Sequence, residues 1–498
     1  MANEETFVSY LTHSSSVNEC SHILQNPVVD HGSVNSSYKT QLIEEVPLMS
    51  KQRIIWNLFV LSFSYLMFQT GFWGLTNLQS TMNAAGGMGP DSQAVIYAAS
   101  MISSLFLPEI TIENFGCKRV LIFTTILGLP YLASNMYLRW DVLLSMSTLF
   151  GLISGPYNGA LTVYIDELAI RYQALTKQDL EFVVAVFFGV YSCFMEGTQI
   201  FGNAISFIVI SERHVIPRNL TDNNTLPLKC GIDFDAHGNV TNSNLEVPPE
   251  HERIVLVCTY VGMGLFSVLL LCCFLDPLKN DIKEGSGWKS ACHRFLAAIK
   301  HVGNPHQILL IPITILIGIE SALYSNEFTE AYIACSWGVH HVGFVTICFG
   351  VCGAIMSLLV GPLVKYISQM AVLILAACAN IGICVLLFLW DPTPETTSIY
   401  FIIAGVWGMG DAIWWSQISA LYGLMFPNDR EAAFSNLYFW SFLGFFLSYS
   451  YANYLSVAVK INILMAFLLT GMACYLVGQI KIKCSARKEY IHIENGNQ

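Results

Sequence analysis

Residues 254–275 read IVLVCTYVGMGLFSVLLLCCFL, an apolar run without one charged side chain. A helix of roughly 20 such residues is long enough to cross the hydrocarbon core of a bilayer. Charged or polar residues bound the run at both ends, as they do for a membrane span. This stretch therefore predicts a transmembrane helix, which indicates that the chain is a membrane protein.

The composition of all 498 residues supports this prediction. The chain is 54% hydrophobic and only 12% charged, about half the charged fraction of an ordinary soluble domain. A formal net charge of -11 removes the basic surface that nucleic-acid binding requires. We therefore expect the lipid bilayer as the surroundings of this chain and no nucleic acid as a partner.

A search for further apolar runs of this length gives twelve expected spans in total. Outer-membrane barrels would show short alternating segments instead, so the sequence predicts an all-α membrane protein. The expected spans are residues 54–76, 92–112, 119–138, 142–164, 184–210, 254–275, 307–325, 340–360, 369–390, 399–423, 434–457 and 461–480.

Charge counting predicts the orientation of these spans. With the amino terminus in the cytoplasm, 18 of the 24 Lys and Arg residues fall on the cytoplasmic side and 6 on the other. Cytoplasmic loops carry the excess of basic residues in membrane proteins. Both termini are therefore expected inside. Residues 1–50 lack the pattern of a cleaved signal peptide.

The loop 211–253 is expected outside and carries three N-x-[ST] sequons, at Asn219, Asn223 and Asn239. We predict these as glycosylation sites. Cys230 in this loop and Cys335 also fall on the outer side, where the oxidising compartment permits a disulfide between them. The sequence does not give their separation, so the pairing stays open.

The spans divide into two groups of six, in residues 54–276 and 306–480. Residues 277–305 connect them, and 1–53 and 481–498 form cytoplasmic tails, the first expected to be disordered. An apolar stripe in the connecting segment allows either an amphipathic helix on the membrane or a solvated linker. This arrangement predicts two pseudo-repeated six-helix bundles, similar to the major facilitator fold.

Two segments resemble degraded copies of the major facilitator gate loop, G-x-L-x-D-R-x-G-R-[RK]. The first contains Glu113, Gly116 and Lys118, and the second contains Gly361 and Lys365. In that superfamily the acidic position braces a neighbouring helix end. The corresponding residue is Glu113 in the first copy but Lys365 in the second, so ordinary gating is less expected.

Two carboxylates, Glu196 and Asp411, lie in the middle of expected spans, where each costs at least about 2.5 kcal/mol and requires a pocket, a partner or a proton. Glu196, Gln199 and Asn203 share one helical face, and Asp411 lies near Gln417. One interpretation is a cavity-facing site for a cation or proton. The other is an interhelical hydrogen bond that fixes packing.

Three more acidic residues, Glu320, Glu327 and Glu330, are expected to form a solvated or vestibule-facing rim at the outer end of the seventh span. The cysteines form no C-x-x-C pair, so we expect no metal. The chain also lacks G-x-S-x-G, Walker and H-E-x-x-H motifs. We therefore expect neither enzymatic activity nor a cofactor.

Several segments together resemble the Unc-ninety-three family, and its A-type branch above all. Two positions depart from the family pattern: Glu196 stands where relatives often have a neutral residue, and Leu437 follows Asn436 where relatives have Arg. The similarity runs from about residue 53 to 480, in segments 77–83, 86–89, 96–98, 199–203, 328–335, 407–412, 417, 420–423 and 431–436.

The resemblance implies a major-facilitator-like body whose relatives regulate a two-pore-domain potassium channel or accompany Toll-like receptors during trafficking. A potassium channel is thus the implied membrane-protein partner, and the plasma membrane the implied location. Tail motifs such as Tyr490-Ile-His-Ile493 also allow an endosomal pool. The alternative hypothesis is a proton- or cation-coupled transporter of a small solute that uses Glu196 and Asp411.

Overall fold

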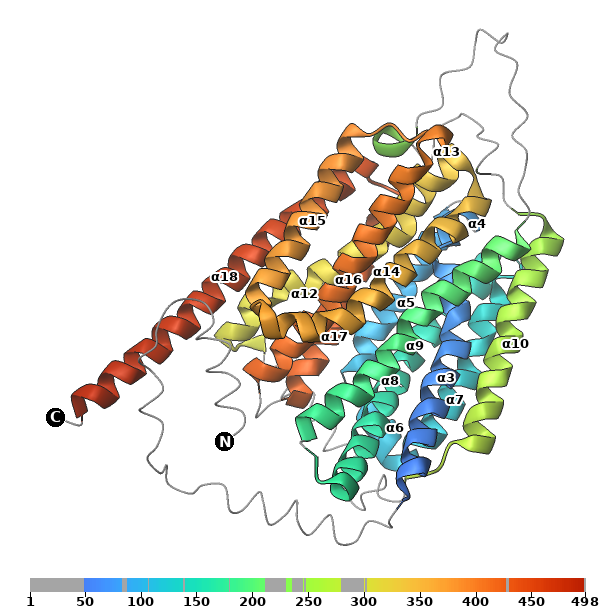
Figure 1. Ribbon diagram of the computed structural model, residues 1–498. Coiled ribbons are helices and arrows are strands. Elements are labelled where there is room, and N and C mark those ends of the chain that lie inside the picture. The colour runs from blue at the N-terminus through green and yellow to red at the C-terminus, as the bar shows by residue number, and fades with distance from the viewer. Residues whose placement is uncertain are drawn as a thin grey trace.

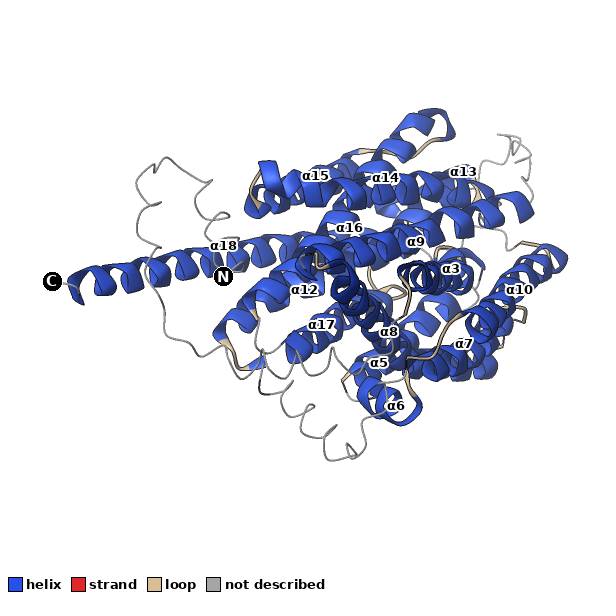
Figure 2. Cartoon of the chain, turned by 60° about the horizontal axis from the view of Figure 1, so that its bottom comes forward, coloured by secondary structure: helices blue, strands red, loops and turns tan. Residues whose placement is uncertain are grey.

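The computed structural model describes residues 49–82, 87–105, 107–137, 139–178, 180–210, 230–234, 245, 248–278, 300, 302–426 and 430–496. Helices and loops make up all of this described part of the chain, and Figure 2 draws no strand in it. Eight of the described helical segments are long and apolar enough to cross a membrane. The all-α prediction is confirmed.

The helices of the first half follow the expected spans, except that the fourth long helix continues well beyond residue 164. Ser50 caps the first helix, since its side chain accepts a hydrogen bond from the backbone N–H of Arg53. The helices are α3 (Lys51–Thr76), α4 (Gln79–Met82), α5 (Met88–Ser104), α6 (Leu107–Phe115), α7 (Cys117–Ser134), α8 (Trp140–Thr176), α9 (Leu180–Val209), η3 (Gly231–Asp233) and α10 (Glu250–Phe274). The second expected span comprises α5 and α6.

The second half again contains six long helical passes. Asn304 caps the first of them, and Pro305 occupies the initial helical position, where a missing N–H costs nothing. The elements are α12 (Pro305–Leu323), η5 (Tyr324–Ala334), α13 (Cys335–Trp337), α14 (Val339–Tyr366), α15 (Gln369–Leu389), η6 (Pro394–Thr396), α16 (Thr397–Met425), α17 (Arg430–Tyr451) and α18 (Val457–Gly496).

The seventh expected span, 307–325, is too short. The helix does not end there but continues through the π-helical segment η5 into α13, so one pass extends from Pro305 to Trp337. A π-helix inside an α-helix is rare and often marks a functional site.

The two groups of helices lie side by side (Figure 1). Two long contacts join them: α9 packs along α14, and α5 packs along α17. Glycines let the first pair approach closely, because a Cβ at Gly343 would lie 2.6 Å from the carbonyl oxygen of Asn203. The structure is thus the expected pair of six-helix bundles.

Several contacts join the halves at the end where α4 and α13 lie, which we call the disulfide end (Figure 1). The amide of Asn453, after α17, donates to the carbonyl oxygen of Gly87 and to Oδ1 of Asp91, each at 3.1 Å. Deeper along the same contact, the Tyr97 ring stacks on Phe445 with centroids 4.3 Å apart. These contacts hold α5 against α17.

A disulfide gives this end its name. Cys230, directly before η3, is bonded to Cys335 at the start of α13, with Cα atoms 5.7 Å apart. The bridge therefore connects the first half to the second, and η3 packs on η5 and α18. The sequence permitted this pair without giving its separation.

Three predictions fall on residues outside the described part. These are the glycan acceptors Asn219, Asn223 and Asn239, the amphipathic helix expected in the connecting segment, and the disorder expected for the amino-terminal tail.

The disulfide predicts the behaviour of a chain cut between its halves. With a protease site inserted in the connecting segment 277–305, the cleaved protein should run as one band on a non-reducing denaturing gel and as two bands after reduction. The Cys230→Ser variant serves as the control and should give two bands in both lanes. If the cleaved protein that keeps both cysteines gave two bands without reductant, the bridge would be excluded.

Candidate acidic site in the helical core

Glu196 lies where α9, α14 and α16 meet. Its side chain is 8% exposed. A Cβ at Gly353 of α14 would lie 3.1 Å from Oε2 of Glu196 and 3.3 Å from the carbonyl oxygen of Gly408 in α16. The carboxyl therefore reaches across the interface between the halves, beside Ser357 and within electrostatic range of Asp411.

Asp411 faces the pass that begins with α12. The Ser321 hydroxyl donates a 2.6 Å hydrogen bond to Oδ1 of Asp411, and the Glu320 side chain is its other close polar neighbour. Asp411 is partly buried, whereas Glu320 is fully buried. The structure thus brings Glu196 and Asp411 into one electrostatic neighbourhood, and a third carboxyl joins them.

The prediction that Glu320 lies in a solvated or vestibule-facing rim is wrong. Because the helix continues past residue 325, Glu320 lies inside the pass and not at its end. Its carboxyl meets Asp411, Asn380 of α15 and Trp407 of α16. Sequence reasoning missed this residue as a site member because it grouped three acidic residues as one exposed cluster.

Of the other two residues of the expected rim, Glu327 is buried as well, whereas Glu330 is only partly buried. Glu327 pairs with Lys460 of α18, with 2.6 Å between Oε1 and Nζ, and both side chains are almost fully buried. Lys460 Nζ also donates to the Ala452 carbonyl oxygen, and Asn326 donates to Glu327. Glu330 is partly buried beside this pair.

Gln199 and Asn203 do not join the acidic site. The amide of Asn77, at the end of α3, donates to Gln199 Oε1 at 2.9 Å and to Asn203 Oδ1 at 3.3 Å. These side chains therefore fasten α9 to α3. Gln417 is likewise separate, since its backbone carbonyl accepts from Gln369 and its amide contacts Ser416.

The two gate-loop segments differ in structure. Gly116 has φ +76 and separates α6 from α7, whereas Gly361 lies within α14 with open space around it, so the second segment is not a loop there. Lys118, and not Glu113, braces a neighbouring helix end. Its Nζ donates to the carbonyl oxygens of Cys272 and Leu275, at 3.1 and 2.6 Å.

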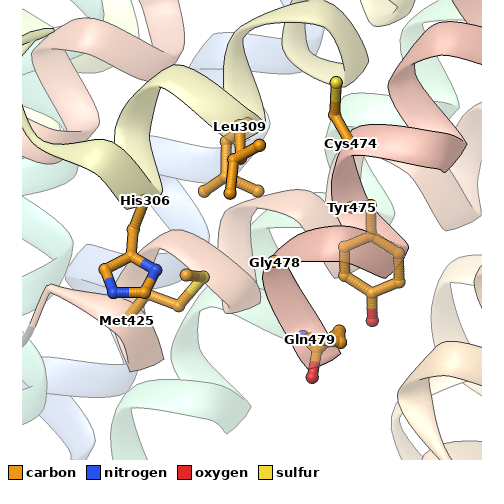
Figure 3. A pocket seen from close by; sticks show the side chains of 8 residues that line it. His306, Leu309, Met425, Cys474, Tyr475, Gly478 and Gln479 are labelled. Carbon is orange, nitrogen blue, oxygen red and sulfur yellow. The ribbon is translucent and has the colours of Figure 1, made fainter. Parts of the chain in front are cut away.

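A small pocket of about 10 Å³ lies among α12, α16 and α18, away from the acidic residues (Figure 3). This volume holds about one water molecule. Cys474 points away from His306 (Figure 3). Across the described part of the chain, moreover, no three His, Cys, Asp or Glu residues are placed to hold a metal ion.

Comparison with known proteins identifies the family. The profile of the family described as "Ion channel regulatory protein UNC-93" matches residues 79–476. The chain belongs to the UNC-93 family. A relative from Xenopus laevis, "Protein unc-93 homolog A", is 35% identical over 423 residues, which cover 84% of this chain and 92% of the relative. This confirms the family resemblance and its A-type branch.

Two further relatives of this UNC-93 family member come from human and from a nematode. The human "Protein unc-93 homolog A" is 29% identical over 430 residues, covering 85% of this chain and 93% of the relative. The "Putative potassium channel regulatory protein unc-93" of Caenorhabditis elegans is 29% identical over 432 residues, covering 86% of this chain and 61% of that protein.

Solved structures confirm the major-facilitator-like fold. A variant of the nucleoside transporter NupG superimposes with a TM-score of 0.60 at 15% identity, covering 85% of this chain and 98% of NupG. A D-xylose-proton symporter gives 0.58 at 12% identity, covering 86% and 97%. Identities this low show a shared fold alone.

The buried pair Lys460–Glu327 predicts a large loss of stability when one partner is removed. Lys460→Met leaves Glu327 buried without its cation, which typically costs about 3–5 kcal/mol. Thermal unfolding of the full-length protein in nanodiscs measures the change. Lys481→Met, at an exposed position of the same helix, is the matched control, and equal effects of both variants would contradict the buried pair.

The ion pair of Asp276, just beyond α10, with Arg53 predicts that the fold loses stability in acid. The pKa of this carboxyl lies below its usual range, mainly because Arg53 donates hydrogen bonds to it. A carboxyl with a lowered folded-state pKa stabilises the fold above its unfolded-state pKa, and that stabilisation is lost as pH falls through the folded-state pKa.

Asp276→Asn should therefore lower the melting temperature at neutral pH and reduce the further loss on acidification. The measurement is thermal unfolding of wild type and variant at neutral and acidic pH. Asp391→Asn, at an exposed carboxyl, controls for the change of net charge. An identical acid-induced loss in wild type and Asp276→Asn would refute the role of this ion pair.

Proposed function

We propose that this chain is a non-enzymatic membrane protein that regulates a potassium channel of the two-pore-domain type. The observation that carries the proposal is the family match over residues 79–476. The printed name of the worm relative, a putative potassium channel regulatory protein, gives the class of partner. The proposal includes a location at the plasma membrane, cytoplasmic termini and glycans on Asn219, Asn223 and Asn239.

The structure supports a regulatory body in two ways. First, the contacts of Asn453 and Tyr97 close the halves against each other at the disulfide end. Second, the second-half gate segment is part of α14. The contacts at the disulfide end would have to break for the halves to rock apart there. The exposed apolar side chains of outer helices such as α10, for example Leu265 and Leu269, are available for contact with a neighbouring membrane protein.

Co-expression with two-pore-domain potassium channels tests this proposal. We expect a changed whole-cell potassium current and co-purification of the two proteins from mild detergent. The double variant Glu196→Gln with Asp411→Asn should keep this effect, since the proposed contact lies on the outer surface of the bundle. An unchanged current and no co-purification with any channel of this class would overturn the proposal.

A second candidate function is proton- or cation-coupled transport of a small solute. Glu196 of one half lies within electrostatic range of Asp411 of the other, and this favours transport because carboxylates at the interface of two repeats are typical of coupling sites. Solute uptake into vesicles that depends on a proton or sodium gradient, and that is lost in Glu196→Gln and Asp411→Asn, would support transport. Uptake that both variants retain would exclude the site.

A further inference from the structure

The strongest unexplained feature of the molecule is the surroundings of Glu320. This side chain is fully buried, and among the described residues neither of its carboxyl oxygens has a hydrogen-bond partner of normal geometry. Asn380 is 3% exposed, and both atoms of its amide also lack such a partner. The same holds for the indole N–H of the buried Trp407.

These unsatisfied groups are neighbours. Asp411, Asn380 and Trp407 are the polar side chains around the Glu320 carboxyl. Buried polar groups are nearly always hydrogen-bonded, and an unsatisfied one costs about 1–3 kcal/mol. Asn380 and Trp407 can each donate an N–H to Glu320, but an ionised Asp411 has no donor of its own, so the contact between the two carboxyls is the part of the cluster that requires a further partner.

The charged side chains around the cluster decide what can pair the two carboxyls. From α15, Cys384 and Asn380 face Glu320, and from α16, Asp411 and Trp407 do so. Among the described residues, no Lys, Arg or His forms an ion pair with Glu320 or Asp411. Two ionised carboxylates in contact would therefore repel without a cation between them.

A metal cation fits this cluster poorly, because Asn380 and Trp407 bring N–H groups that would repel it. A proton fits. A protonated Glu320 donates its O–H to the Asp411 carboxylate, and its remaining carbonyl oxygen accepts from the N–H of Trp407 or Asn380. Ser321 already donates to Asp411 Oδ1 at 2.6 Å, so the ionised member of the pair has a second donor.

We propose that Glu320 and Asp411 form a proton-binding site in the core of the second half, with the proton on Glu320 and Asp411 as its acceptor. No covalent chemistry occurs beyond the binding of one proton to one carboxylate oxygen. Asp411 is partly buried, whereas Glu320 is fully buried.

Glu196 connects this site to the first half of the molecule. It lies within electrostatic range of Asp411 and reaches the backbone of α14 at Gly353. A change of charge at Asp411 therefore acts across the α9–α14 contact. The inference concerns proton binding alone and holds for a channel regulator and for a transporter.

Infrared spectroscopy of the full-length protein in nanodiscs tests the site. The carbonyl stretch of a protonated carboxyl is separate from that of a carboxylate and shifts in heavy water. At neutral pH, the difference between wild type and Glu320→Gln should show the loss of one protonated-carboxyl band. Glu395→Gln, at an exposed carboxyl in η6, should leave this spectral region unchanged.

Asp411→Asn provides the second arm and does not depend on the folding of the first variant. The proton stays on Glu320 but loses its ionised acceptor, so the band should persist and move to higher frequency. Unchanged protonated-carboxyl absorption in Glu320→Gln would overturn the proposal. A band that stays at the same frequency in Asp411→Asn would equally overturn it, because Asp411 would then not be the acceptor.

Discussion

The cost of placing charge inside a bilayer is the constraint on which the rest of this structure depends. An ionisable side chain in a span costs at least about 2.5 kcal/mol unless it is paired, solvated or neutralised. The second half satisfies this constraint in two ways: Lys460 pairs with Glu327, and Glu320 faces Asp411. The first is an ion pair with a cation of its own, whereas the second has no cation and requires a proton.

Close packing brings these carboxyls together. Glycines on α14 and α16 remove the side chains that would keep α9 and the two helices apart, since a Cβ at Gly408 would lie 2.2 Å from the Phe349 carbonyl oxygen. Glu196 reaches across the contact so formed. The disulfide between Cys230 and Cys335 and the Asn453 contacts hold the halves at the disulfide end. The acidic site is therefore built by the interface as much as by single helices.

The sequence predicts the twelve passes, the paired bundles and the family, because apolar length and motif order are properties of the linear chain. It does not predict the end of the seventh pass, where Glu320, Glu327 and Glu330 suggested a solvated rim. A buried acidic residue is recognisable only once its partner is known, and Lys460 and Asp411 lie far along the chain. Likewise, Gln199 and Asn203 share a face with Glu196, but their binding to Asn77 depends on where α3 ends.

The central claim is that Glu320 and Asp411 act as one coupled unit. A double-mutant cycle of Glu320→Gln and Asp411→Asn, followed by unfolding of the full-length protein in nanodiscs, measures that coupling most directly. Side chains that share a hydrogen bond or proton couple by about 0.5–3 kcal/mol, and this is the predicted result. Effects that add to within about 0.5 kcal/mol, as for distant residues, would contradict it.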